Sequence, residues 1–348
     1  FFEDPASGLR AIVAIHSTAL GPAAGGCRRW TYASDDLALT DVLRLSRGMT
    51  YKNAVAGLPF GGGKSVILAR EHAPKSKALF QAFGRAIDSL QGRYITAEDV
   101  GISVEDMRIV RSETPFVSGL PQSGAAAGGD PSPWTALGVF HGIEAAAAAR
   151  LGSESLEGVS VAVQGVGHVG TYLCKLLHEA GAKLLVADVN RENLVSLCEE
   201  VPAEVVSPRD ILFSDADVLA PCALGNVLNS ETIPRIRAKI VAGAANNQLA
   251  SVEDGARLAE RGVLYAPDYV INAGGVISVA YEYLGNSTEA KVRSEVCRIP
   301  QRLRRIFADA VSSARPTNVV ADELAQQIVA KGRQTETTNR STAGRLIA

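Results

Sequence analysis

The segment Val159–Gly170, which reads VSVAVQGVGHVG, decides the fold of this chain of 348 residues. Its first half is largely apolar, which is typical of a parallel strand that is buried on both faces. Its second half has the spacing G-x-G-x-x-G, and the pattern that follows predicts a helix to Ala180. A strand that runs through such glycines into a helix indicates a dinucleotide-binding α/β domain.

The three glycines of this fingerprint are expected to have different tasks. Gly165 makes the tight turn, Gly167 lets a pyrophosphate approach the backbone at the helix N-terminus, and Gly170 lets helix and strand pack closely. Asp188 follows the next predicted strand, where a carboxylate bonds a ribose diol and repels a 2′-phosphate. NAD is therefore predicted over NADP, although Arg191 is close by. A tight turn without a cofactor is the alternative interpretation.

Regular strand–helix alternation surrounds the fingerprint, so residues 134–312 are predicted to form one NAD-binding domain of the Rossmann type. Helices 313–348 are expected to pack back on the first domain, with a loose tail from 334. The other predicted elements here are strands 183–186, 218–220, 240–243 and 263–265 and helices 134–151, 275–284, 289–314 and 320–333.

Residues 1–133 read as a separate α/β domain, and the Gly/Pro-rich segment 124–133 is a candidate hinge. The predicted strands are 9–18, a second one entered through Gly25 and Gly26, 65–69 and 93–97, and the predicted helices are 35–48, 76–91 and 104–111.

The stretch Met49–Lys64, MTYKNAVAGLPFGGGK, places two lysines around an apolar segment that ends in three glycines. Glycines let a backbone pass close to another group, so Lys64 is well placed to reach a bound anion or carbonyl. The stretch nearly matches a phosphate-binding loop, but the spacing is wrong and a strand follows Lys64 instead of a helix. A glycine-rich turn with solvated lysines is the remaining alternative.

A dinucleotide domain beside a domain with paired lysines suggests a dehydrogenase with a cleft between the two domains. Such an enzyme needs an acid or base. Asp99 is the best candidate, because it follows a strand end in the run TAEDVG and Gly101 leaves room beside it. A helix-capping or solvated aspartate is the alternative for Asp99.

Composition excludes several classes of function. The net charge is −2, and there is no basic run of the kind that binds nucleic acid and no apolar run of membrane-spanning length. The five cysteines are far apart and lack metal-type spacing, so reduced thiols and no metal are expected. No secretory signal is visible, and a cytoplasmic location is expected.

Seven motifs, in order along nearly the whole chain, resemble those of the glutamate/leucine/phenylalanine/valine dehydrogenases, and the resemblance is greatest to the leucine-specific members. The motifs are Met49–Asn53, Gly61–Lys64, Thr96–Gly101, Gly165–Gly170, Ala220–Gly225, Ala244–Gln248 and Pro267–Gly275. The resemblance implies NAD-dependent, reversible oxidative deamination of an L-amino acid, which yields a 2-oxo acid, ammonium and NADH.

The resemblance also implies roles for individual residues. Lys52 would hold the substrate carboxylate near the Gly26 backbone. Lys64 would stabilise the developing oxyanion and activate water, and Asp99 would move protons to and from the amino group. Asn272 would bond the substrate, and Thr135 the nicotinamide end. Further cofactor contacts would come from the fingerprint and the later motifs: His168, Val169, Cys222, Ala223, Ala244 and Asn246.

The candidate substrate pocket contains no basic residue, so an apolar substrate is predicted, with leucine, valine and isoleucine favoured. Its residues are Ala24, Met49, Ala97, Val276 and Val279. Leucine enzymes of the family usually carry leucine where this chain has Ala24, so a phenylalanine or tryptophan enzyme is an alternative. The segment Gly124–Asp130 also departs from the family pattern.

Two other functions remain possible at this point. A non-catalytic relative that senses NAD or an amino acid is disfavoured by the intact Lys52, Lys64 and Asp99, and an NADP-dependent glutamate enzyme is disfavoured by Asp188 and the apolar pocket. The resemblance further implies a homo-oligomer, an octamer or tetramer, assembled through the first domain.

Overall fold

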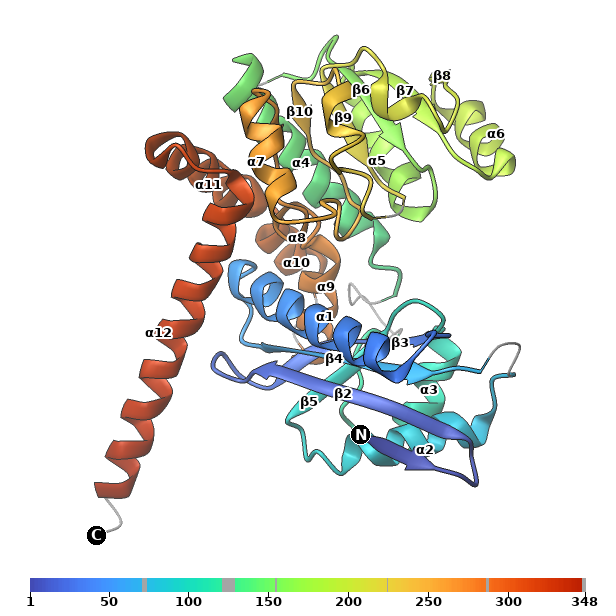
Figure 1. The fold of residues 1–348 in the computed structure, drawn as a ribbon, viewed down its shortest axis with the longest axis vertical. Helices are drawn as coiled ribbons and strands as arrows, with labels where there is room; N and C mark the ends of the chain where they lie inside the picture. Colours follow the sequence, from blue (N-terminus) through green and yellow to red (C-terminus); the bar gives the residue numbers. More distant parts are fainter. Residues whose placement is uncertain (71–73, 121–128, 154, 224, 286–287, 346–348) are drawn as a thin grey trace. The chain divides into compact units, whose positions relative to one another are not determined.

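The computed structural model describes residues 1–70, 74–120, 129–153, 155–223, 225–285 and 288–345, with backbone only from 335 (Figure 1). The chain divides into two compact units. Unit 1 comprises Phe1–Gly129, Val279–Thr288 and Leu324–Ala348; unit 2 comprises Asp130–Ser278 and Glu289–Glu323. These boundaries differ from the expected 133 and 312, and residues 279–288 group with unit 1.

Unit 1 is built on a mixed sheet of five strands in the order β1-β2-β4-β3-β5. β2 is antiparallel to β1 and β4, whereas β3 is parallel to both β4 and β5. The strands are β1 (Phe2–Asp4), β2 (Leu9–Ser17), β3 (Ala23–Trp30), β4 (Gly61–Leu68) and β5 (Tyr94–Glu98), and the helices are α1 (Asp35–Val55), α2 (Lys77–Asp88) and α3 (Val104–Arg111). β1 was not expected from the sequence.

Two apolar layers hold the helices of unit 1 to the sheet. Ala38 and Val42 of α1 pack on Ile12 and Val66 at one face. The other face is covered by α2 and α3, whose buried side chains include Phe83. The sheet is thus buried on both sides, which explains why β4 lacks the alternation of exposed and buried residues.

Two elements around the glycine run Gly61–Gly63 differ from the expected ones. Strand β4 begins with this run, although it was expected only from residue 65. Helix α1 continues to Val55, beyond the expected end at 48. A Cβ atom at Gly62 would lie 2.0 Å from the backbone nitrogen of Thr50 in α1. The run therefore lets a helix lie against the strand, and it is not a turn around a ligand.

Unit 2 contains a parallel sheet of six strands in the order β11-β10-β9-β6-β7-β8, which is the strand order of dinucleotide-binding domains. The strands are β6 (Ser160–Gln164), β7 (Lys183–Ala187), β8 (Glu204–Val205), β9 (Val218–Pro221), β10 (Ile240–Val241) and β11 (Leu264–Tyr265). The helices up to the boundary are α4 (Ser132–Leu151), α5 (His168–Glu179), α6 (Arg191–Glu200), α7 (Glu253–Glu260), α8 (Asp268–Ile271) and α9 (Gly274–Tyr283), with short 3₁₀ turns at Ile211–Phe213 and Ile233–Arg235.

The C-terminal helices differ from the expected ones. The single helix expected over 289–314 is two helices, α10 (Glu289–Val296) and α11 (Ile299–Ser313), because Pro300 lacks the N–H that would continue the first. The tail expected to be loose belongs to α12 (Thr317–Arg345), which no proline interrupts. Within the described part of the chain, no helix is both long and apolar enough to span a bilayer.

Candidate active site

Three parallel strands of unit 1 bring Lys64 and Asp99 together. Lys64 lies on β4, Asp99 follows β5, and β3 with Gly26 runs between them. The Nζ atom of Lys64 is 2.5 Å from Oδ2 of Asp99. A Cβ atom at Gly26 would be 2.9 Å from Cβ of Asp99 and 2.6 Å from the carbonyl oxygen of Glu98. Gly26 therefore leaves the space across which the two charges meet.

The ion pair is largely shielded from water. The side chain of Lys64 is 9% exposed and that of Asp99 is 24% exposed. Burial alone would raise the pKa of Asp99, but the charge and hydrogen bond of Lys64, the amide of Val100 and the charge of Arg28 together lower it. Asp99 is thus an ionised carboxylate next to a buried ammonium, which is a suitable pair for proton transfer. The alternative interpretation, a solvated or helix-capping aspartate, does not fit this contact.

The remaining predicted residues of unit 1 lie on three elements, α1, β3 and β5. Met49 and Lys52 lie three residues apart on α1 and so share one face of the helix. Cγ of Met49 would be 3.1 Å from a Cβ atom at Gly25, which places the Met49 side chain over β3. Ala24 and Ala97 are half-buried on β3 and β5.

Val279 and Val276 lie on α9, on the two sides of the boundary between the units. Val279 groups with unit 1, where its Cγ1 atom would be 4.0 Å from a Cβ atom at Gly119. Val276 groups with unit 2. Both side chains are half-buried.

Asn272 joins two of the predicted cofactor residues in unit 2. Its Nδ2 atom donates to the carbonyl of Ala244 at 3.0 Å and to Oδ1 of Asn246 at 2.9 Å. Asn272 is 5% exposed, and its Oδ1 atom accepts no hydrogen bond from the described residues. This carboxamide is therefore held by its donor end with its acceptor end available for a ligand.

Thr135 lies close to the same segment. Its hydroxyl donates to the carbonyl of Pro131 at 3.1 Å in the first turn of α4. A Cβ atom at Gly275 would be 2.5 Å from this hydroxyl oxygen, so the glycine lets the start of α9 approach Thr135 closely. The structure thus brings Thr135 and Asn272 to one region of unit 2. Residues 124–128 of the expected hinge 124–133 lie outside the described residues, as does Leu224 of the fifth motif.

The glycine fingerprint has the geometry that a pyrophosphate needs. Gly165 has a φ of 93°, and a Cβ atom at Gly170 would be 2.1 Å from the carbonyl oxygen of Gly165. At Gly167 a Cβ atom would meet no described atom within 4 Å, so the backbone is open there. His168 begins α5 directly afterwards and is exposed, with Val169 half-buried. These residues fit a dinucleotide whose phosphates bind the N-terminus of α5.

Asp188 is held beside the fingerprint turn. Its carboxylate accepts the N–H of Val166 at 2.8 Å and the N–H of Asn190 at 2.7 Å. The side chain bridges the ends of β6 and β7, which is the position expected for a ribose-binding acid.

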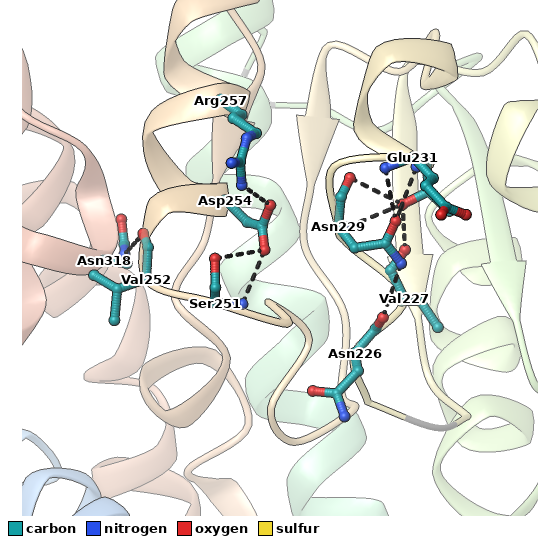
Figure 2. Close-up of polar contacts among 10 residues, drawn as sticks. Asn226, Val227, Asn229, Glu231, Ser251, Val252, Asp254, Arg257 and Asn318 are labelled. Carbon is teal, nitrogen blue, oxygen red and sulfur yellow. Dashed lines mark hydrogen bonds and ion pairs between the residues drawn. The ribbon is translucent and has the colours of Figure 1, made fainter.

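The loops that carry the later motifs are fastened to each other. The N–H of Asn226 donates to the carbonyl of Asn247 at 2.6 Å, and the N–H of Leu228 donates to that of Gln248 at 3.0 Å. Figure 2 shows Asn229 in the same loop as Asn226; its Oδ1 atom accepts the N–H of Glu231 at 3.0 Å. Hydrogen bonds thus join the loops that contain the predicted contacts Ala223 and Asn246, which spacing alone did not reveal.

Asp254 holds the start of α7 in place. It accepts the N–H of Ser251 at 2.8 Å and pairs with Arg257 at 2.6 Å (Figure 2).

Cys222 at the end of β9 donates its N–H to the carbonyl of Gln164 at 2.7 Å, and burial raises the pKa of its thiol to about 12. Burial therefore favours the neutral form of this thiol.

Three polar residues near the pair were missed from the sequence. Arg28 on β3 lies 3.9 Å from Asp99, and it pairs with Asp41 of α1 at 3.0 Å. Tyr32 donates its hydroxyl to the carboxylate of Asp41 at 2.6 Å. The alternation of a strand puts Arg28 on the face of Gly26, and this signal could have identified it. Within the described residues, no group of three or more His, Cys, Asp and Glu is arranged to hold a metal.

Two family models match the chain. Residues 2–116 match the Glu/Leu/Phe/Val dehydrogenase dimerisation domain, and residues 130–193 and 185–336 match the Glutamate/Leucine/Phenylalanine/Valine dehydrogenase domain. The chain belongs to this dehydrogenase family. It is an amino-acid dehydrogenase, as the resemblance implied.

Individual relatives are similar over almost their full length. The chain is 52% identical to a leucine dehydrogenase of Geobacillus stearothermophilus over 94% of this chain and 89% of that protein. It is 51% identical to a leucine dehydrogenase of Thermoactinomyces intermedius over 97% and 91%. The crystal structure of L-tryptophan dehydrogenase from Nostoc punctiforme has a TM-score of 0.83 at 44% identity and covers 96% of this chain and 95% of its own.

Proposed function

We propose that this chain catalyses the NAD-dependent, reversible oxidative deamination of an apolar L-amino acid, with leucine, valine and isoleucine favoured. The observation that carries the proposal is the shielded contact between Lys64 and Asp99 across Gly26. Two leucine dehydrogenases at 52% and 51% identity support the substrate class. Asp188 beside the fingerprint supports NAD over NADP, since a carboxylate repels a 2′-phosphate.

The acid–base chemistry would be carried by unit 1. Hydride leaves Cα more readily when the amino group is neutral, so Asp99 as a carboxylate would accept the ammonium proton. When bound, the nicotinamide ring supplies the hydride acceptor. Lys64 would then direct water to the imine carbon and stabilise the oxygen that becomes negative, and Lys52 would hold the substrate carboxylate as a fixed cation.

The pocket favours an apolar substrate of variable size. Ala24, Met49 and Ala97 offer no cation for a side-chain carboxylate, and the charge of Arg28 is already engaged by Asp41 and Asp99. The small side chain of Ala24 leaves more volume than a leucine would. One or two methylenes change substrate discrimination by only about 1–3 kcal/mol, so activity with phenylalanine or tryptophan is the second candidate. The similar structure from Nostoc punctiforme is named an L-tryptophan dehydrogenase, which supports this second candidate.

A steady-state assay tests the proposal. NADH absorbance would be followed with L-leucine, L-valine, L-isoleucine, L-phenylalanine, L-tryptophan and L-glutamate, each with NAD and with NADP. We expect turnover with NAD and the apolar substrates, and a loss in Lys64→Ala of about 10²–10⁴-fold in kcat. Lys77→Ala, at an exposed position of α2, is the matched control. Absence of turnover with every amino acid would disprove the activity.

A substitution at Ala24 tests the pocket. Ala24→Leu should lower kcat/KM for tryptophan and phenylalanine by about tenfold or more relative to leucine, because the added methylenes fill the pocket. Equal losses for all substrates would instead indicate a general disturbance of β3.

We also propose a cytoplasmic homo-oligomer, an octamer or tetramer, assembled through unit 1. The match of residues 2–116 to a dimerisation domain supports this assembly. Light scattering on the purified protein gives the mass that tests it, and a monomer at micromolar concentration would contradict it.

A further inference from the structure

A row of polar side chains continues behind the Lys64–Asp99 pair. Tyr32 donates its hydroxyl to Oδ2 of Asp41 at 2.6 Å, and Nη1 of Arg28 donates to the same oxygen at 3.0 Å. Asp41 lies on α1 and Arg28 on β3, so the row links the helix to the strand between the two catalytic candidates. The side chains of Arg28 and Asp41 are 24% and 27% exposed, so water screens them only in part.

Arg28 presents another of its N–H donors to Asp99. The Nε atom of Arg28 is 3.9 Å from Oδ2 of Asp99, which is too far for a hydrogen bond. This Nε atom is buried and has no hydrogen-bond acceptor among the described residues. A movement of the Asp99 carboxylate toward Arg28 would bring its Oδ2 atom within hydrogen-bond distance of this Nε donor.

The two cations near Asp99 are not equivalent. Lys64 has a flexible stem and a compact ammonium, and the proposed reaction requires it to turn to the substrate. Arg28 is anchored by Asp41 and does not lose its proton in proteins. When Lys64 engages the substrate, Arg28 is the cation that stays beside Asp99.

The other groups that face Asp99 add no competing charge. Lys64 faces it from β4 and Arg28 from β3, and the amide of Val100 also favours the ionised form. Burial raises the pKa of Cys27 to about 12 and raises the pKa of Tyr94 as well, so both stay neutral. The ionisation of Asp99 therefore depends on Lys64, on the amide of Val100 and on Arg28, and Lys64 and Arg28 are the two that carry a charge.

We propose that Arg28 is a positioning residue that keeps Asp99 ionised and oriented while Lys64 acts on the substrate, with Asp41 and Tyr32 fixing the guanidinium. This inference rests on the proposed deaminase activity. Its consequence is that the acid limb of the pH profile is set by Arg28 as well as by Lys64.

The test is the pH dependence of kcat/KM in Arg28→Gln and Arg28→Lys. Without the guanidinium, the pKa of Asp99 rises, so its carboxylate is lost at a higher pH as the solution is acidified. Arg28→Gln should therefore lose about threefold to tenfold more kcat/KM on the acid limb than on the alkaline plateau. Arg28→Lys retains a charge and should recover most of the acid limb. A merely structural role would lower kcat/KM equally at every pH.

Arg10→Gln is the matched control. Arg10 pairs with Asp35 at 2.6 Å on the same unit, but both side chains are exposed, at 45% and 64%. We expect its acid limb to coincide with that of the native protein. An unchanged acid limb in folded, active Arg28→Gln, or an equal change in Arg10→Gln, would overturn the inference.

A measurement without turnover separates this inference from the activity itself. The ¹³C carboxyl signal of Asp99, identified by its loss in Asp99→Asn, is titrated in protein without substrate or cofactor. Its midpoint should move to higher pH in Arg28→Gln and stay near the native position in Arg28→Lys. If the native protein is inactive, the proposed function is wrong, and the titration still tests the role of Arg28. If the protein is active but the midpoint does not move in Arg28→Gln, the proposed role of Arg28 is wrong.

Discussion

The chain contains two glycine-rich segments, and their glycines do opposite things. Gly61–Gly63 in unit 1 are closed in by protein: a Cβ atom at Gly62 would be 2.0 Å from the nitrogen of Thr50. Gly167 in unit 2 faces no described atom within 4 Å. The same residue type thus serves packing in one segment and ligand access in the other. Glycine content by itself does not indicate a ligand.

The aspartates beside these segments differ as well. Asp99 is next to the ammonium of Lys64, whereas Asp188 accepts two backbone N–H groups. The first aspartate has a partner that can exchange a proton, and the second has donors that only orient it. This contrast fits chemistry in unit 1 and cofactor binding in unit 2.

The largest effect is expected from Gly62→Ala. The new methyl group would collide with the backbone of α1, which cannot rotate away, so the free energy of unfolding should fall by about 3 kcal/mol or more. Chemical denaturation of the full chain measures this loss. Native-like stability of Gly62→Ala would show that α1 is not in close contact with β4. It would contradict the contrast between the enclosed Gly61–Gly63 and the open Gly167.

Asp99→Asn is expected to have the next largest effect. It should lower the free energy of unfolding by about 1–3 kcal/mol at pH 7, because it leaves the buried ammonium of Lys64 without its anion. The pKa of Asp99 is lowered in the folded state, so its stabilisation is present above the ordinary value of 3.8 and is lost as pH falls through the folded value. The difference in unfolding free energy between native protein and variant should therefore shrink only below about pH 4.

The control for this pH series is Asp35→Asn. It removes an exposed carboxylate from its pair with Arg10 and should cost far less at pH 7. A difference between native protein and Asp99→Asn that stayed constant from pH 7 to pH 3 would contradict the assigned pairing.

Gly167→Ala should change binding and leave folding nearly intact. Gly167 has φ −70°, which alanine adopts readily, so the unfolding free energy should change by no more than about 0.5 kcal/mol. The methyl group would occupy space that the pyrophosphate needs, and the Kd for NAD should rise about tenfold, or about 1.4 kcal/mol. Calorimetric titration with NAD measures it. Gly170→Ala, whose Cβ atom would be 2.1 Å from the carbonyl oxygen of Gly165, should instead lower the unfolding free energy.

The smallest expected effect is a gain. Gly48 lies on α1, is exposed, and a Cβ atom there would meet no described atom within 4 Å. Gly48→Ala should raise the unfolding free energy by about 0.5–1 kcal/mol, since alanine loses less backbone entropy in a helix. Thermal unfolding of Gly48→Ala, compared with that of Gly62→Ala and the native protein, measures this gain. A loss of stability at both positions would mean that α1 tolerates no change, whatever the local space.

Much of unit 2 was predictable because its pattern is local. The apolar strand, the three glycines and the following helix are contiguous in Val159–Glu179, and each glycine lies where its task requires. Errors arose where a neighbour in space decided the outcome. The break between α10 and α11 was visible at Pro300, but the helical extension of α1 to Val55 depends on β4 beneath it.

The site in unit 1 shows where sequence reasoning ends. The residue types and motif order were sufficient to select Lys52, Lys64 and Asp99 and to indicate the family. They were insufficient to place Lys64 next to Asp99, or to show that Arg28 lies near that pair. The strands occur along the chain as β3, β4 and β5 but lie in the order β4-β3-β5, so a distant glycine separates the two charges. Strand order is set by how the whole sheet buries its two faces, and that is a property of the tertiary structure alone.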